Sequence, residues 1–195
     1  MADSDSDLSN AAWERNCRLQ FSYTSQFCEE NVHKMIAKFL LLKPRLLHPA
    51  ISFYAVFVSS KSKQTPIWHQ KAGIRDEPVL WDYHVILVAK GLSPVQIDEL
   101  CHPAENVVSS DSNKSQIVLC SDGVNISSTI PQLNDRDQHL QSYVFDLDSN
   151  LSFPTTAVEY YHQAMRPELG IPIEHAQVFR VIPAEDFLNY FSSDR

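Results

Sequence analysis

The sequence has little glycine, with four residues among 195. Phosphate-binding loops of the GxGxxG and GxxxxGK types need closely spaced glycines, so that backbone N–H groups can approach a phosphate. No such spacing occurs in the chain. Gly-rich phosphate loops are therefore excluded, and we expect the protein to work without a cofactor.

Positive charge is also scarce. The chain carries 16 basic and 24 acidic residues, for a formal net charge of −8. Nucleic acids and anionic membranes require a positive protein surface, so neither is expected as a main partner. The acidic chain would bind a cationic group on a partner more favourably.

Long hydrophobic runs and cysteine pairs are missing as well. No run approaches the ~20 apolar residues of a membrane span, and the acidic N-terminus lacks the apolar region of a signal peptide. The four cysteines, at positions 17, 28, 101 and 120, are too few and too scattered for a disulfide framework, and none forms a CxxC pair. We therefore expect a protein of the cytosol and nucleus.

The length allows one domain, which we place at residues 21–195. Residues 1–20 mix Asp, Ser and Asn without a helical or strand period and predict a flexible tail. Residues 91–140 are rich in Ser, Asn, Asp and Pro. A loop of that length is uncommon within a compact domain. It predicts a disordered insert, with a separate binding appendage as the alternative.

The remaining chain has the periods of an α+β protein. Apolar residues at i, i+3, i+4, i+7 and i+8 predict an amphipathic helix that starts near Cys28 and ends at the prolines at 44 and 49. Strand-like segments follow, the first two as a hairpin, in a mostly antiparallel sheet packed against the helix. The predicted strands are 53–60, 65–72, 78–90, 141–149 and 176–184, and the later helices are 155–165, capped by Thr155 or Thr156, and 184–191.

Cys28 raises the first question of chemistry. At the head of a helix, a cysteine feels unpaired backbone N–H groups and the positive end of the helix dipole, both of which favour the thiolate. The alternative is a small buried hydrophobic residue. A nearby base would decide between them.

A candidate base and acid lie on two predicted strands. In "LWDYHVILV", His84 sits within an apolar strand, where it needs a hydrogen-bonded partner. In "VFDLDSN", Asp146 and Asp148 share one face, and strand pairing would bring a carboxylate to ~5 Å from the imidazole. Each alone reads more simply as a core histidine or a turn-capping aspartate. Together, Cys28, His84 and Asp146 follow the logic of a papain-like triad.

Five longer motifs carry a resemblance to a known family. They are "YTSQFCEENVHKM", "YAVFVSSKSKQTPIWHQKA", "VLWDYHVILV", "YVFDLDSNLSFPT" and "FRVIPAEDFLNYFSSDR". The chain from about Tyr23 to Arg195, apart from the insert, resembles the eukaryotic protein N-terminal glutamine amidohydrolases, which deamidate amino-terminal glutamine in the N-degron pathway.

The resemblance implies a fold and a mechanism. The expected fold is papain-like or transglutaminase-like, with Cys28, His84 and Asp146 as the triad. The expected reaction converts amino-terminal glutamine to glutamate and ammonia through a thioester, without a metal. The resemblance also implies an arginyl transferase of the same pathway as a possible partner. We expect the chain to be a monomer.

Two departures from the family pattern accompany the resemblance. The family usually joins the WDYH and DLD strands by a short connection, whereas this chain interposes residues 91–140. Family members also continue past "FSSDR", so we expect this chain to lack the family's C-terminal segment. These departures put its stability and turnover in question.

Residues around the triad are candidates for binding the substrate. A carboxylate could receive the substrate's α-ammonium, and the alternative is that first-turn acids complement the helix dipole. Aromatic residues could wall the pocket, or pack in the core. The acidic candidates are Glu29, Glu30 and Asp82; the aromatic ones are Trp68, Trp81 and Tyr83; the oxyanion donors beside the Cys28 N–H are Gln26, Ser25 and Tyr23.

Three other interpretations stay open. A cysteine peptidase or a transglutaminase-like acyl transferase would use the same triad in a more open cleft. A non-catalytic interaction module would leave Cys28 no more reactive than Cys101 or Cys120. A zinc site is the third, although the spacing of Cys101, His102, Cys120 and His139 matches no zinc template.

Overall fold

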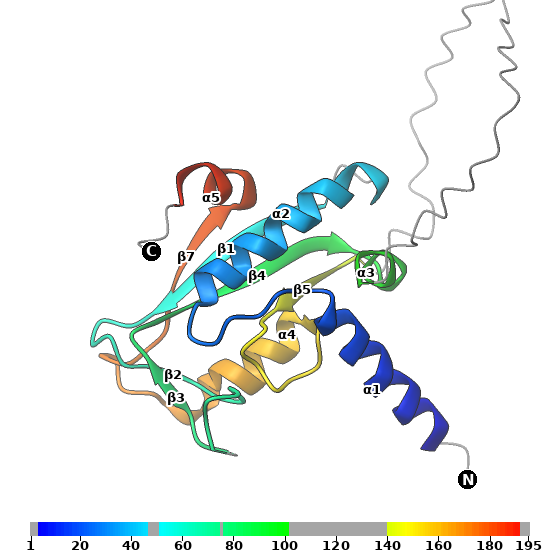
Figure 1. Cartoon of the computed structure of the whole chain (residues 1–195). Coiled ribbons are helices and arrows are strands. Elements are labelled where there is room, and N and C mark those ends of the chain that lie inside the picture. Colours follow the sequence, from blue (N-terminus) through cyan, green and yellow to red (C-terminus); the bar gives the residue numbers. More distant parts are fainter. Residues whose placement is uncertain (1–3, 47–50, 75, 102–139, 192–195) are drawn as a thin grey trace, which may run out of the picture.

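The computed structural model describes residues 4–46, 51–74, 76–101 and 140–191. Its centre is a five-stranded antiparallel sheet in the order β6-β5-β4-β1-β7, with helices on both faces (Figure 1). The α+β class is therefore confirmed. The strands are β1 (Ser52–Ser59), β4 (Tyr83–Leu92), β5 (Gln141–Phe145), β6 (Thr155–Thr156) and β7 (Val178–Pro183).

Helix α2 (Cys28–Leu46) covers one face of this sheet, as the hydrophobic stripe predicts. Phe39 is fully buried, and its ring lies 5.5 Å from that of Phe53 on β1 and 4.8 Å from that of Phe145 on β5. Helix α5 (Ala184–Tyr190) packs beside it and buries Phe187. The predicted start at Cys28 is confirmed. The predicted end is also confirmed, because the helix ends at Leu46, between the prolines at 44 and 49.

The opposite face is covered by α4 (Ala157–Tyr160) and the π-helical turn η2 (Tyr161–Met165). Tyr160 and Met165 are buried there against a second apolar cluster that includes Ile86 of β4. Thr156, one of the two predicted caps, accepts a hydrogen bond from the Glu159 N–H. A short 3₁₀ turn, η3 (Pro167–Leu169), follows.

The predicted hairpin of residues 53–60 and 65–72 is wrong. Strand β1 pairs with β4 on one side and β7 on the other, so neither edge is open. Instead, β2 (Thr65–Ile67) pairs with β3 (Val79–Trp81) in a separate two-stranded sheet. The predicted strand 78–90 is divided at Asp82, whose carboxylate accepts the Tyr83 N–H at 2.8 Å.

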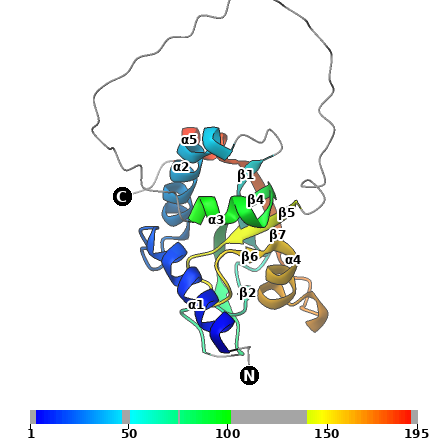
Figure 2. The ribbon, with the colours of Figure 1, turned by 90° about the vertical axis from the view of Figure 1, so that its right-hand side faces the viewer.

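The expectation of an unstructured N-terminal tail is also wrong, because residues Ser4–Leu19 form helix α1. The end of this helix is fixed by distant residues: Cys17 is fully buried and forms a disulfide with Cys101. Local sequence gives no sign of such contacts. Figure 2 shows α1 on the side of the molecule that also carries α3.

The predicted boundary of the insert at residue 91 needs correction. Strand β4 continues to Leu92, and α3 (Pro94–Cys101) follows it with Ile97 and Leu100 buried. The rest of the predicted insert, residues 102–139, lies outside the described residues. Within the described part of the chain, no helix has the length and apolar character needed to cross a membrane.

Candidate active site

Strand pairing brings His84 and Asp146 together. β4 and β5 are antiparallel neighbours with Leu87 opposite Phe145, so the residue after β5 reaches toward the start of β4. The His84 Nε2 atom lies 3.0 Å from the Asp146 Oδ1 atom, and both side chains are buried. The alternation of side chains along the two strands predicts this neighbourhood.

Protein donors surround the Asp146 carboxylate. Its Oδ2 accepts hydrogen bonds from Gln70 Nε2 at 3.2 Å and from the Tyr160 hydroxyl at 2.7 Å, and its Oδ1 accepts the Asp148 N–H at 3.0 Å. Burial alone would raise the pKa of Asp146, but the His84 charge and these donors lower it to about 2. The carboxylate is therefore held in place and kept ionised.

Sequence reasoning missed Gln70 and Tyr160. Gln70 comes from the segment after β2, which an isolated bridge to Ser149 holds beside Asp146. Nothing in "WHQKA" marks it. Tyr160 lies on the buried face of the predicted helix, and a buried tyrosine usually needs a partner for its hydroxyl. That signal could have identified Tyr160 as a polar neighbour of the core.

The environment of His84 favours its charged form. Complete burial alone would lower the pKa of the imidazole, but the Asp146 charge and hydrogen bonding to Asp146 and Cys28 raise it to about 10. Trp81 stacks on the ring, with centroids 5.0 Å apart and planes 25° apart. The indole and the carboxylate together restrict the orientation of the imidazole.

Cys28 is the first residue of α2 and is only 4% exposed. Burial raises the pKa of its thiol, while hydrogen bonding to His84, the His84 charge and the Val85 backbone lower it in part. Burial therefore opposes the loss of this proton, which the start of the helix is expected to favour. Of the groups that lower the pKa of Cys28, His84 contributes most.

Glu29 and Tyr83 flank the sulfur. The Cys28 Sγ–H donates to Glu29 Oε2 at 3.3 Å, and the Tyr83 hydroxyl donates to Glu29 Oε1 at 3.3 Å. Burial and the Glu29 charge raise the pKa of Tyr83 to about 12. The structure thus brings Glu29 and Tyr83, two of the predicted binding residues, close to Cys28.

The other acidic candidates have local roles. Glu30 pairs with Lys34 one turn along α2, with the charged atoms 2.8 Å apart. Asp82 is exposed and accepts the backbone N–H of Tyr83. Glu30 and Asp82 thus each have a local partner, Lys34 and the Tyr83 backbone respectively.

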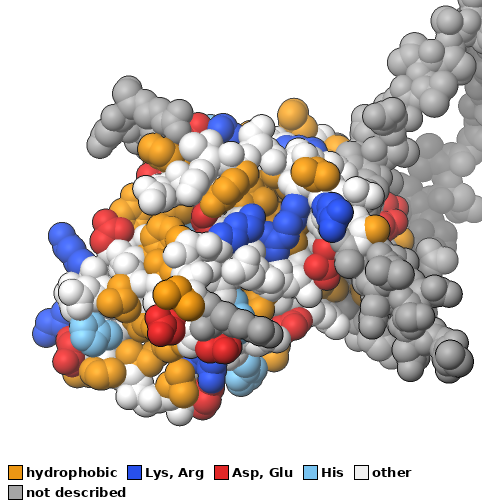
Figure 3. All heavy atoms as spheres, turned by 60° about the horizontal axis from the view of Figure 1, so that its bottom comes forward, with side chains coloured by type: hydrophobic (Ala, Val, Ile, Leu, Met, Phe, Trp, Pro, Cys, Tyr) orange, Lys and Arg blue, Asp and Glu red, His pale blue; other side chains and the backbone are white. Residues whose placement is uncertain are grey.

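Trp68 is buried, but it lines a different cavity. This cavity of about 360 Å³ lies between the β2-β3 sheet and the η3 region, and its wall includes Trp68, Leu80, Leu169 and His175. Figure 3 views the face at the bottom of Figure 1, where hydrophobic side chains are interspersed with charged ones of both signs. Cys28, His84 and Asp146 do not line this cavity, whereas Trp81 stacks on His84 and Tyr83 donates a hydrogen bond to Glu29.

The predicted oxyanion donors lie in the turn before α2. Ser25 and Gln26 are exposed, and Gln26 has a φ of 67°. The Tyr23 hydroxyl instead donates to Asp148 Oδ1 at 2.6 Å, and burial with this bond raises the pKa of Tyr23 to about 12. The Tyr23 hydroxyl therefore lies beside Asp148, two residues from Asp146.

One set of side chains could offer ligand atoms to a metal. Within the described residues, atoms of His84, Asp146 and Asp148 lie within 4.8 Å of one another. Their carboxylates already accept bonds from Gln70, Tyr160 and Tyr23, which a metal would have to displace. Of the zinc candidates, Cys101 is in the disulfide, and residues 102, 120 and 139 lie outside the described part of the chain.

Comparison with known proteins identifies the family of the chain. A family model described as N-terminal glutamine amidase matches residues 23–195. The protein N-terminal glutamine amidohydrolases of Drosophila erecta and Drosophila melanogaster are 34% identical to the chain over 175 residues, and that of Drosophila virilis is 33% identical. These matches cover 89% of the chain and 62% of each relative, so the chain spans less than two thirds of their length. The chain belongs to the N-terminal glutamine amidase family.

Proposed function

We propose that this chain hydrolyses the side-chain amide of an amino-terminal glutamine, with Cys28 as nucleophile, His84 as general base and Asp146 as the group that orients His84. The buried His84–Asp146 pair, with 3.0 Å between nitrogen and oxygen beside the first residue of α2, carries this proposal. The family match supports the substrate. A catalytic helix on an antiparallel sheet also fits the papain-like or transglutaminase-like fold that we propose.

The first step is proton transfer from Cys28 to His84. Burial raises the pKa of the thiol even with His84 beside it, so the thiolate forms together with the imidazolium, as a pair. In this thiolate–imidazolium pair, the Asp146 charge stabilises the imidazolium and raises the pKa of His84 to about 10. The thiolate then attacks the carboxamide carbon of the glutamine side chain, and a tetrahedral intermediate forms.

The second step releases ammonia. Imidazolium protonates the departing nitrogen, the carbon–nitrogen bond breaks, and a thioester to Cys28 remains. His84 is then neutral and can take a proton from water, whose oxygen attacks the thioester. Breaking the carbon–sulfur bond releases glutamate and returns the thiol.

The oxyanion of both intermediates needs hydrogen-bond donors. The backbone N–H of Cys28, in the first turn of α2, is one. Ser25 or Gln26 would supply the second, because both are exposed beside the start of α2. Tyr23 is a weaker candidate, since its hydroxyl already donates to Asp148.

Glu29 is our candidate for the group that recognises the α-ammonium. Its carboxylate lies 3.3 Å from the sulfur and is held by Tyr83. The α-ammonium of a bound substrate could replace the thiol proton as its partner once the thiolate has formed. A carboxylate at this position would reject substrates whose amino group is acetylated.

Peptides that begin with Gln, Asn and acetyl-Gln test the proposal. We expect ammonia release from the first alone, and loss of release in Cys28→Ala. Ammonia from acetyl-Gln at a similar rate would contradict recognition of the terminus. Cleavage of internal peptide bonds would favour a cysteine peptidase, and transfer of the acyl group to an added amine would favour a transglutaminase-like enzyme.

A further inference from the structure

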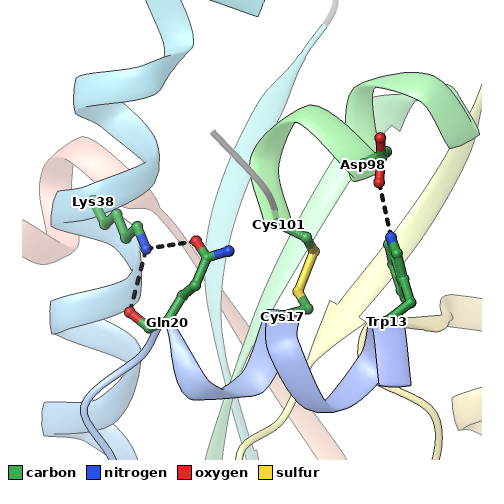
Figure 4. The surroundings of a disulfide bond; sticks show 6 residues. All are labelled: Trp13, Cys17, Gln20, Lys38, Asp98 and Cys101. Atoms are coloured by element: carbon green, nitrogen blue, oxygen red, sulfur yellow. Dashed lines mark hydrogen bonds between the residues drawn. A yellow bond between two sulfur atoms is a disulfide. The ribbon is translucent and has the colours of Figure 1, made fainter. Parts of the chain in front are cut away.

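The end of helix α1 is tied to the rest of the domain at several points, which Figure 4 shows. The Cys17–Cys101 disulfide joins it to α3, and Trp13 Nε1 donates to Asp98 Oδ1 of α3 at 2.8 Å. After the helix, Gln20 accepts two hydrogen bonds from Lys38 Nζ of α2, at 3.2 Å and 3.0 Å. The segment is therefore fixed both to α3 and to the helix that begins with Cys28.

Arg18 lies in this segment, and its side chain reaches the backbone at Asp146. Its Nη1 donates to the backbone carbonyl of Asp146 at 3.4 Å, and its Nη2 donates to the backbone carbonyl of Leu151. The guanidinium also lies 4.6 Å from the centroid of the Phe153 ring. One partly buried cation thus holds both ends of the turn that follows β5.

We propose that Arg18 is a positioning residue for the His84–Asp146 pair, and that the Cys17–Cys101 disulfide keeps Arg18 in place. This inference rests on the proposed function. The position of the Asp146 carboxylate depends on the backbone at residue 146, because the side chain has only two rotatable bonds. Arg18 acts through that backbone and contacts no reacting atom.

Because a disulfide can be reduced, we expect the positioning of Asp146 by Arg18 to be sensitive to dithiols. A dithiol thiolate attacks one sulfur of the bond and forms a mixed disulfide; the second thiol of the reagent then displaces it. Two electrons pass from the reagent to Cys17 and Cys101, which become thiols, while the reagent becomes a disulfide. Helix α1 would lose its covalent anchor to α3, so the hydrogen bonds from Arg18 to the Asp146 and Leu151 carbonyls would be held less firmly.

Substitution of Arg18 tests the positioning role. We expect Arg18→Met to lower kcat about tenfold, with KM changed less than about twofold, because a displaced base slows chemistry more than binding. The NMR titration midpoint of His84 should move to lower pH, because a loosened Asp146 stabilises imidazolium less. Arg18→Lys should recover part of both effects, and Arg15→Met, on the exposed side of α1, should change neither.

Reduction tests the role of the disulfide. Dithiothreitol should lower kcat of the wild-type chain by about two- to threefold. The double variant Cys17→Ser/Cys101→Ser should have a similarly lowered kcat from the start, and dithiothreitol should not change it further. If kcat of the wild-type chain stays constant after Cys17 and Cys101 are shown to be reduced, the proposed role of the disulfide is wrong.

The two proposals can fail separately. If Arg18→Met, folded by circular dichroism, keeps the wild-type His84 titration and kcat, positioning by Arg18 is wrong. If Arg18→Met does not fold, Arg18→Lys and the dithiothreitol series carry the same test. If the wild-type chain releases no ammonia, the proposed function fails, whereas the His84 titration still decides the role of Arg18.

Discussion

The two sides of the candidate site are built differently. On the acid side, His84 and Asp146 come from neighbouring strands, are buried, and are surrounded by Gln70, Tyr160 and Trp81. On the sulfur side, Cys28 begins a helix beside Tyr83, whose side chain is partly exposed. The comparison teaches that buried partners hold the His84 ring in place, whereas Cys28, itself 4% exposed, lies beside a side chain that is partly exposed.

Removal of the sulfur should have the largest effect. We expect Cys28→Ala to lower kcat/KM for a Gln-initiated peptide by ~10³-fold or more, because no other group can form the thioester. Ammonia release measures the loss. An unchanged unfolding temperature would show that the fold is intact, and a loss below tenfold would mean that the sulfur side does not carry the chemistry.

Neutralising the acid should come next. Asp146→Asn keeps the shape of the side chain but removes the charge that raises the pKa of His84 to about 10, so kcat should fall on the order of 10³-fold. The pH–rate profile should show a base with a pKa nearer the ordinary value. A variant with wild-type kcat would contradict the role of the acid side.

The same pair should make stability depend on pH. The folded chain raises the pKa of His84 from 6.5 to about 10, so this stabilisation is complete below about pH 6.5 and is lost as pH rises toward 10. It lowers the pKa of Asp146 from 3.8 to about 2, so that stabilisation is lost as pH falls from 3.8 toward 2. Unfolding temperatures should decline in both windows, and less so in Asp146→Asn.

A smaller effect is expected from one donor to the acid. Tyr160→Phe removes the hydroxyl that lies 2.7 Å from Asp146 Oδ2, and kcat should fall about tenfold, since a hydrogen bond to a charged group is lost. Tyr161→Phe is the matched control, because Tyr161 is the next residue in the chain and its side chain is exposed. Equal rates for the two variants would show that the carboxylate does not depend on this donor.

The smallest effect should come from the sulfur side. Glu29→Gln should raise KM for a Gln-initiated peptide about fivefold, because a neutral amide binds an ammonium less strongly than a carboxylate does. kcat should not fall, since the Glu29 charge raises the pKa of Cys28. Glu30→Gln, whose carboxylate pairs with Lys34, serves as the control. An equal change of KM in both variants would remove Glu29 from substrate recognition.

The sequence predicts the positions of Cys28, His84 and Asp146 better than it predicts the residues that hold them in place. A hydrophobic stripe locates the start of α2 at Cys28, and alternation along two strands brings His84 and Asp146 together, because both patterns are local. The disulfide of Cys17 spans 84 residues, and Gln70 reaches Asp146 across 76, so neither leaves a periodic signal. Helix α1 was missed for the same reason.

Alkylation of Cys28 by iodoacetamide across a range of pH tests the central claim most directly, because it reports the Cys28–His84 proton transfer without a substrate. In the wild-type chain, the rate at pH 6 should stay within a few fold of the rate at pH 8, because His84 holds the proton. In His84→Ala, it should fall about tenfold per pH unit, as for an isolated thiol. The same steep fall in the wild-type chain would contradict the account.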